Sequence, residues 1–271
     1  MSDDPEKPVE ELTITNVMNR GREKAMGFFD HLEEMRWMLI KCAVTFTLFA
    51  GLIGYFLEQF NEALMWPLQK IQAENPTVHL NLITNSVLSS FTVVIQMCVL
   101  GGLVTSAPFM LFFIGRFVSP ALNEKELKVV LPLCAAAFVL FLCGASFGFF
   151  ILVPGTLRIS LQLSNMFHYD PLWTAESYFS TLTKLVLGVG ATFEFPLVII
   201  LLIWLGIMST AFLRKYRRHA IVVIVIIAAI VTPTPDPVNM MVMATPLYVL
   251  FELAILIGWR VEKRREKMNA S

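Results

Sequence analysis

The sequence predicts an all-α integral membrane protein, a bundle of six membrane-spanning helices with both termini on one side. Hydrophobic residues make up 56% of the chain and charged residues only 15%, whereas a soluble domain usually carries about 25% charged residues. The apolar residues fall in long uncharged runs, and a spanning helix needs roughly 20 of them. Because the runs are continuous rather than alternating, they are typical of helices and not of barrel strands.

Six apolar segments are candidates for spans. They are residues 37–57, 86–115, 129–157, 185–213, 219–232 and 238–259. The fifth has about 14 residues at 1.5 Å each, so its length is roughly 21 Å, short of a hydrocarbon core near 30 Å. The sixth is also modest. We therefore expect short fifth and sixth helices, whose hairpin is buried or thins the bilayer around it.

The basic residues are distributed unevenly along the chain. Of the 21 Lys and Arg residues, only Lys70, Arg158 and Lys184 fall on one side of the predicted bundle. The others flank the opposite ends of the spans, and basic flanks remain in the cytoplasm. The pattern predicts that both termini are cytoplasmic, which agrees with an even number of spans.

The chain is expected to form one membrane domain. We place it at residues 25–260, between a polar N-terminal tail at 1–24 and a basic cytoplasmic tail at 261–271. The zero net charge gives no sign of nucleic acid as a partner. The cysteines have no paired spacing and the histidines are scattered, so we expect no disulfide, metal or cofactor. No nucleophile–base pair or phosphate-binding glycine loop favours an enzyme.

The segment before the first span has an amphipathic pattern. Apolar residues including Leu32 and Met35 recur at spacings of three and four over residues 28–39, so a helix along the membrane surface is expected. Glu33 and Glu34 lie on its opposite face. From the pattern alone, a solvated acidic face is the simpler interpretation.

The loop after the second span contains a second acidic feature. Within residues 117–126, Ser119 and Pro120 begin a turn and Asn123 is a candidate helix cap. A functional interpretation requires that Glu34 and Glu126 meet in space. Two carboxylates there would suit a ligand with paired guanidiniums, since a carboxylate can hold each arginine through two parallel hydrogen bonds.

Two acids lie inside predicted spans. Glu194 is near the middle of the fourth, where a charge costs at least about 2.5–3.5 kcal/mol, and Pro196 is expected to kink the helix. Glu194 is therefore predicted to be neutral, paired or facing a water-filled concavity, and we favour a functional role. Glu252 lies nearer the cytoplasmic end of the sixth span, and for it both interpretations stay open.

Prolines mark two predicted structural turns. Residues 232–237 alternate proline with Thr232, Thr234 and Asp236, which cannot continue a helix and should form a rigid hairpin tip around Pro235. Pro67 marks a turn in the first loop on the side opposite the termini. Neither turn requires a function.

Four segments, in this order, resemble the signature segments of the TatC family. They are residues 31–36, 117–122 followed by Glu126, 193–196 and 232–236. The resemblance covers about residues 28–260. It implies a cupped bundle in the bacterial cytoplasmic (inner) membrane that receives twin-arginine signal peptides on its cytoplasmic face. With TatA- and TatB-type single-span subunits, and as a homo-oligomer within the complex, it would export folded proteins using the proton-motive force.

The resemblance also implies roles for particular residues. Glu34 and Glu126 match the acids that form the pocket for the paired arginines, and Arg36 and Phe117 match positions that line the same surface.

Deeper in the bundle, Glu194 matches an intramembrane acid that faces the concavity, and Thr232 a polar position linked to partner contact. Two positions depart from the family's pattern. Met38 replaces a usual basic residue, and Met240 replaces a glutamine that often helps bind the partner.

Two other functions are compatible with parts of the sequence. A small-molecule or proton-coupled carrier could use Glu194, although the pseudo-symmetric halves of many carriers are not visible. A purely structural scaffold would explain every acid by capping and interfaces.

Overall fold

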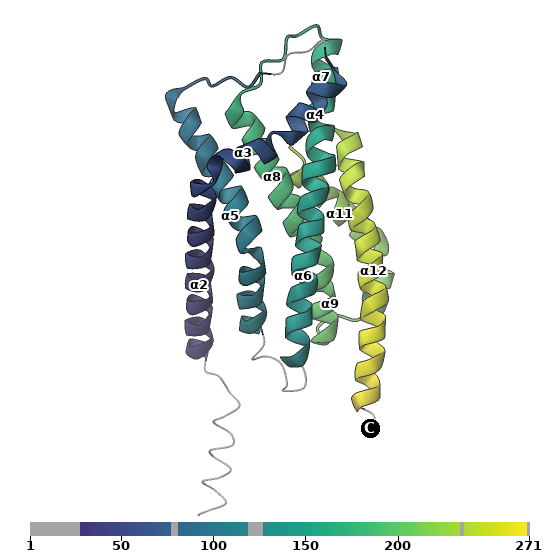
Figure 1. Cartoon of the computed structure of the whole chain (residues 1–271). Coiled ribbons are helices and arrows are strands. Elements are labelled where there is room, and N and C mark those ends of the chain that lie inside the picture. Colours follow the sequence, from purple (N-terminus) through teal and green to yellow (C-terminus); the bar gives the residue numbers. More distant parts are fainter. Residues whose placement is uncertain (1–27, 77–80, 119–126, 234–235, 270–271) are drawn as a thin grey trace, which may run out of the picture.

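The computed structural model describes residues 28–76, 81–118, 127–233 and 236–269 (Figure 1). Its elements are α2 (Phe28–Tyr55), α3 (Leu57–Leu64), α4 (Trp66–Glu74), α5 (Val87–Val118), α6 (Leu127–Phe147), the π-helix η2 (Gly148–Leu152), α7 (Val153–Met166), α8 (Ala175–Phe193), α9 (Phe195–Trp204), α10 (Thr210–Lys215), α11 (Arg217–Val231) and α12 (Pro237–Asn269). Apart from one isolated bridge between Ile83 and Thr174, all regular structure in these ranges is helical. The all-helical prediction is confirmed.

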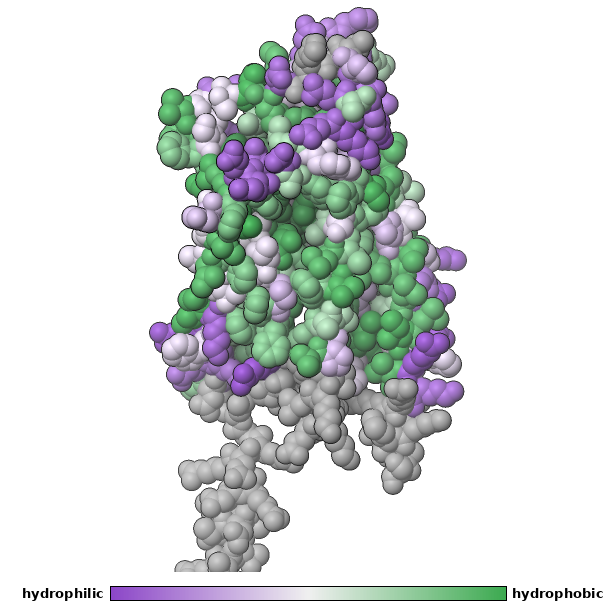
Figure 2. Space-filling view, viewed as in Figure 1, coloured by the Kyte–Doolittle hydropathy of each residue, from purple (hydrophilic) through white to green (hydrophobic). Residues whose placement is uncertain are grey.

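The bundle has two distinct ends. The end where α2 begins and α12 ends is called the terminal end, and the opposite end, which holds α3, α4 and α7, is called the loop end (Figure 1). A broad apolar surface separates the polar residues of the two ends (Figure 2). This distribution is what a helical bundle in a bilayer requires.

Five helical stretches in the described ranges are long and apolar enough to cross a membrane. They are His31–Tyr55, Val87–Phe117, Leu131–Met166, Ala175–Trp204 and Pro237–Lys263. The predicted fifth span corresponds to α11, whose 15 residues give a length of about 22 Å. A short fifth helix is therefore confirmed, while its crossing of the bilayer stays a prediction.

The expectation of a short sixth helix is wrong. α12 has 33 residues and continues past Pro246 to Asn269. A proline inside a helix removes a single backbone donor, and neighbouring helices in a membrane protein can support the bend. The basic residues after 260 extend this helix as far as Asn269.

Parts of the chain between the predicted spans are helical, and the first span begins earlier than predicted. Pro67 lies in the first turn of α4, where a missing N–H costs little, and Pro154 lies just after η2 within the continuous helical stretch Leu131–Met166. α8 begins ten residues earlier than predicted, because the Thr174 hydroxyl accepts a hydrogen bond from the Ser177 N–H. Residues 28–36 are the first turns of α2 rather than a separate surface helix.

The core is centred on α8, and small residues allow its close packing. Leu182, Leu185 and Val189 are fully buried. At Gly144 of α6, a Cβ would lie 2.7 Å from Cγ of Phe193, so only glycine permits this approach. The Tyr178 hydroxyl donates to the buried Leu64 carbonyl at 2.7 Å and joins α8 to α3. α8 therefore connects the loop end to the middle of the bundle.

Candidate functional site

The terminal-end surface is formed where α2 begins and α5 ends. The rings of His31 and Phe117 stack there, with centroids 4.7 Å apart and planes at 17°. Glu34 lies three residues after His31, which places both side chains on neighbouring parts of one helix face. The two sequence segments around residues 31–36 and 117 are therefore adjacent.

Glu34 has an unusual environment in this surface. Its side chain is half-buried, and its Oε2 atom is buried without a hydrogen-bond partner among the described residues. A buried carboxylate oxygen that lacks donors is costly. The geometry therefore suits a cationic donor supplied from outside the chain.

Two other predicted site residues are placed differently. Arg36 is exposed, and two residues along a helix turn a side chain by about 200°, so it points away from Glu34. Glu126 lies outside the described residues. The structure thus brings Glu34 and Phe117 to one place, and Arg36 to the other side of α2.

Glu194 lies at the junction of two helices within one membrane stretch. It follows the last residue of α8 and precedes the first residue of α9, and Pro196 occupies the first turn of α9. Its side chain is half-buried, and its Oε1 atom has no hydrogen-bond partner among the described residues. Glu194 therefore lies at the break between α8 and α9 that Pro196 predicted, and one of its carboxylate oxygens has no partner among the described residues.

The hairpin tip between α11 and α12 is held by polar contacts. The buried Thr232 hydroxyl donates to the Ala228 carbonyl at 2.8 Å. The Asp236 carboxylate accepts from the backbone N–H groups of Asn239 at 2.8 Å and Val238 at 3.3 Å, and so caps α12. Pro235 lies outside the described residues. These contacts account for Thr232 and Asp236 as structural residues.

Glu252, for which both interpretations were open, is paired. Its Oε2 lies 2.8 Å from Nη2 of Arg217, and its Oε1 accepts from the Tyr248 hydroxyl at 3.1 Å. The pair joins the start of α11 to α12. The structural interpretation is therefore favoured, and the basic run before the fifth span was the signal for the partner.

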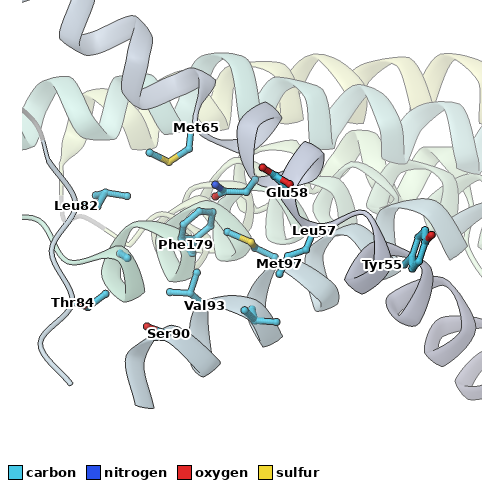
Figure 3. Close-up of a pocket in the computed structure, with 13 residues that line it drawn as sticks. Tyr55, Leu57, Glu58, Met65, Leu82, Thr84, Ser90, Val93, Met97 and Phe179 are labelled. Carbon is cyan, nitrogen blue, oxygen red and sulfur yellow. The ribbon is translucent and has the colours of Figure 1, made fainter. Parts of the chain in front are cut away.

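A cavity at the loop end was missed from the sequence. Its volume is about 640 Å³. Figure 3 shows it lined by α3, α5 and α8, with Glu58 on one side and Val93, Met97 and Phe179 grouped on another. The missed signal was the amphipathic pattern of residues 57–64, most of which lie between the first two predicted spans. Among the described residues, no group of three or more His, Cys, Asp and Glu side chains could hold a metal.

Comparison with known proteins identifies the family. A model of the family described as Sec-independent protein translocase protein (TatC) matches residues 30–246. The chain belongs to the TatC family. The matched range includes the segments that form the terminal-end surface, the helix break at Glu194 and the hairpin tip.

Similar proteins and solved structures support the same family assignment. The TatC protein of Koribacter versatilis (strain Ellin345) is 33% identical over 254 residues, covering 91% of this chain and 92% of its own length. That of Aquifex aeolicus (strain VF5) is 30% identical, with 90% and 99% covered. Two crystal structures of the twin arginine translocase receptor TatC, one of them in DDM, have TM-scores of 0.71 and 0.73 at 31% and 32% identity. They cover 85% and 84% of this chain and 99% of each of those chains.

Membership of the TatC family makes the chain a multi-pass membrane subunit of a Sec-independent protein translocase. The similarity extends over the whole of these relatives rather than over a fragment. The predicted recognition of the family is therefore confirmed, and a role in protein transport follows from it.

Proposed function

We propose that the chain is the receptor subunit of a twin-arginine translocase and binds twin-arginine signal peptides at its terminal end. In this proposal the terminal end faces the cytoplasm of a bacterial cell, and six spans cross its inner membrane. The basic residues that flank the spans at this end favour that orientation. The related solved structures are themselves called twin arginine translocase receptors.

The main support is the unpaired oxygen of Glu34. A guanidinium group offers two parallel N–H donors and a positive charge, and so satisfies a buried carboxylate better than a neutral donor. Access is open, because the Glu34 side chain is only half-buried. Phe117 stacks on His31, one turn before Glu34, and an aromatic face also attracts a guanidinium.

A second carboxylate is needed for the second arginine. We assign this role to Glu126, which directly precedes Leu127, the first residue of α6. Arg36 lies on the far side of α2, so we assign it to the part of the peptide that leaves the pocket. The assignment of Glu126 follows the family resemblance, and the unpaired oxygen of Glu34 supports placing the first arginine beside it.

TatA- and TatB-type single-span subunits are the proposed partners in export. The outer face of α11 exposes Val222, Ile226 and Ile230, which suits a partner helix in the bilayer. Thr232 is buried just past the end of α11, and its role in partner contact rests on the family resemblance. The shortness of α11 would thin the bilayer nearby. We propose that Glu194 faces the same thinned region, and that several copies of the chain assemble in a complex driven by the proton-motive force.

Peptide binding tests the pocket directly. Purified protein in lipid nanodiscs would be titrated with a fluorescent twin-arginine signal peptide. Glu34→Gln removes the charge and should raise Kd about tenfold or more, because hydrogen bonds to charged groups contribute roughly 1.5–3 kcal/mol. The matched control Glu33→Gln changes the exposed neighbour and should leave Kd unchanged.

A peptide with both arginines replaced by lysine should bind weakly to the unaltered protein, because an ammonium cannot form the paired hydrogen bonds. Equal losses for Glu33→Gln and Glu34→Gln would contradict the pocket, since they would indicate a general charge effect.

A further inference from the structure

Two polar side chains with buried oxygen atoms lie in the membrane-spanning parts of α5 and α8. They are Gln96 of α5 and Thr183 of α8. Oε1 of Gln96 and Oγ1 of Thr183 are both buried, and neither has a hydrogen-bond partner among the described residues. An unpaired oxygen in such a place is costly, so two at one depth indicate a missing hydrogen-bonding partner that could bridge them.

The register of the two helices places these oxygens at the same depth. Just before α5 and α8 begin, Ile83 and Thr174 form a parallel bridge. Both helices then run from the loop end toward the terminal end (Figure 1). The Ser89 hydroxyl donates to Oε2 of Glu176 at 3.2 Å, which makes positions 89 and 176 neighbours.

Gln96 and Thr183 each lie seven residues beyond that contact. Seven residues are close to two helical turns, so both return to the faces on which Ser89 and Glu176 meet. α2 packs on a different side of α5, where a Cβ on Gly102 would lie 2.9 Å from Cβ of Ala50. The two oxygens therefore share the seam between α5 and α8.

The loop-end cavity leads toward this seam. Val93 and Met97 of α5 and Phe179 of α8 line its inner side (Figure 3). Val93 and Phe179 lie one turn before Gln96 and Thr183 respectively. Polar residues of the lining, Glu58 and Asn61, would keep the entrance hydrated.

We propose that the α5–α8 seam is a water-binding site, filled through the loop-end cavity, in which a water donates to Oε1 of Gln96 and exchanges a hydrogen bond with the Thr183 hydroxyl. Buried water is held where it can make two to four hydrogen bonds, and the Gln96 oxygen and the Thr183 hydroxyl supply two of them. The site does not depend on signal-peptide binding. It extends an aqueous path about 12 Å into the helix stretch from the start of α8.

The site also bears on Glu194. Thr183 and Glu194 are separated by eleven residues, three turns of α8, so they lie on the same face about 16 Å apart. Hydration of the seam would bring water more than a third of the way from the start of α8 to this acid. We therefore assign to the seam a role in the access of water to Glu194 from the loop end.

Thiol accessibility tests the proposal. The four native cysteines, Cys42, Cys98, Cys134 and Cys143, would first be replaced by alanine. Thr183→Cys and the control Ile95→Cys would then be compared in nanodiscs, which expose both ends to water whatever the orientation. Ile95 adjoins Gln96 but is 62% exposed on the outer surface of the bundle.

A charged methanethiosulfonate reagent reports on water, because only the hydrated thiolate reacts. Thr183→Cys should react about tenfold faster than Ile95→Cys or more, and adding Gln96→Leu should slow its reaction. Equal, slow reactions at 183 and 95 would overturn the proposal by showing a dry seam. If Thr183→Cys does not fold, judged by its elution profile, Gln96→Cys gives the same comparison from α5.

Discussion

α2 and α8 are both long apolar helices, yet they occupy opposite positions in the bundle. In the most apolar stretch of α2, 6% of residues are buried, compared with 39% in the stretch formed by α8 and α9. α2 packs mainly against α5, whereas α8 packs against α5, α6, α7, α11 and α12. α8 is thus the scaffold, and α2 is a peripheral helix that presents Glu34.

Both helices are apolar, so hydrophobicity does not distinguish the structural helix from the one that presents a functional acid. Their positions in the bundle do. A helix buried among several neighbours cannot change without affecting all of them. A helix held mainly by one neighbour can present an unpaired acid such as Glu34 without disturbing the contacts of the other helices. Substitutions in the two helices should therefore have effects of different size and extent.

The largest expected effect comes from Gly144→Ala at the packing of α6 on α8. The new Cβ would meet Cγ of Phe193 at 2.7 Å and the Val189 carbonyl oxygen at 2.9 Å. Overpacking of this kind typically costs about 1–3 kcal/mol, and we expect the upper part of that range because one contact is backbone. Unfolding by SDS titration, followed by tryptophan fluorescence, gives the free energy.

Gly51→Ala in α2 is the matched control, since a Cβ there would meet nothing within 4 Å. Its free energy of unfolding should change by less than about 0.5 kcal/mol. Equal destabilisation by both substitutions would remove the contrast between the two helices.

Tyr178→Phe should have the second-largest effect. It deletes the hydroxyl that donates to the Leu64 carbonyl at 2.7 Å and leaves that buried carbonyl unpaired, which costs about 1–3 kcal/mol. Tyr55→Phe at the exposed end of α2 is the control and should be neutral. The same SDS titration measures both, and an unchanged Tyr178→Phe would show that water replaces the hydroxyl.

Gly102→Ala should have a smaller and more local effect. Its Cβ would lie 2.9 Å from Cβ and 3.0 Å from Cα of Ala50, so α2 must move away from α5. We expect faster hydrogen exchange in α2 and unchanged exchange in α8, because α2 packs on few other elements. Exchange that accelerates in both helices would mean that α2 belongs to the scaffold.

The smallest effect is expected from Glu252→Gln. Its partner Arg217 and Glu252 are partly exposed, at 46% and 27%, and exposed ion pairs contribute about 0–1 kcal/mol. The SDS titration should therefore show at most a slight loss of stability. A loss as large as that of Gly144→Ala would place the α11–α12 contact in the scaffold.

The sequence predicted the elements that depend on hydrophobic length, but not those that depend on packing. The long apolar runs and the short α11 follow from composition alone. Pro67 was interpreted as a turn and the fourth span was started ten residues too late, because a proline or threonine can either end a helix or begin one, and only the surrounding chain decides. The close packing at Gly148, where a Cβ would lie 3.0 Å from the Leu185 carbonyl oxygen, depends on contact with α8 and could not be predicted from local sequence.

In the candidate site, too, some features could be predicted from the local sequence and others depend on packing between distant segments. Glu34 and Glu194 stood out as acids next to or inside apolar runs. The stacking of His31 on Phe117 depends on contact between segments far apart in sequence, so periodicity gave no sign of it. Gln96 and Thr183 were overlooked because single uncharged polar residues are common in spans, and only their shared register makes them informative.

Photocrosslinking from the peptide tests the central claim most directly. A signal peptide with a photoreactive residue beside its arginine pair would be bound to the protein in nanodiscs, irradiated, and the crosslinked segments identified by mass spectrometry. We predict crosslinks to the first turns of α2 around Glu34 and to the end of α5 around Phe117, which disappear when both arginines are lysines. Crosslinks confined to the loop end, or unchanged with lysines, would contradict the account.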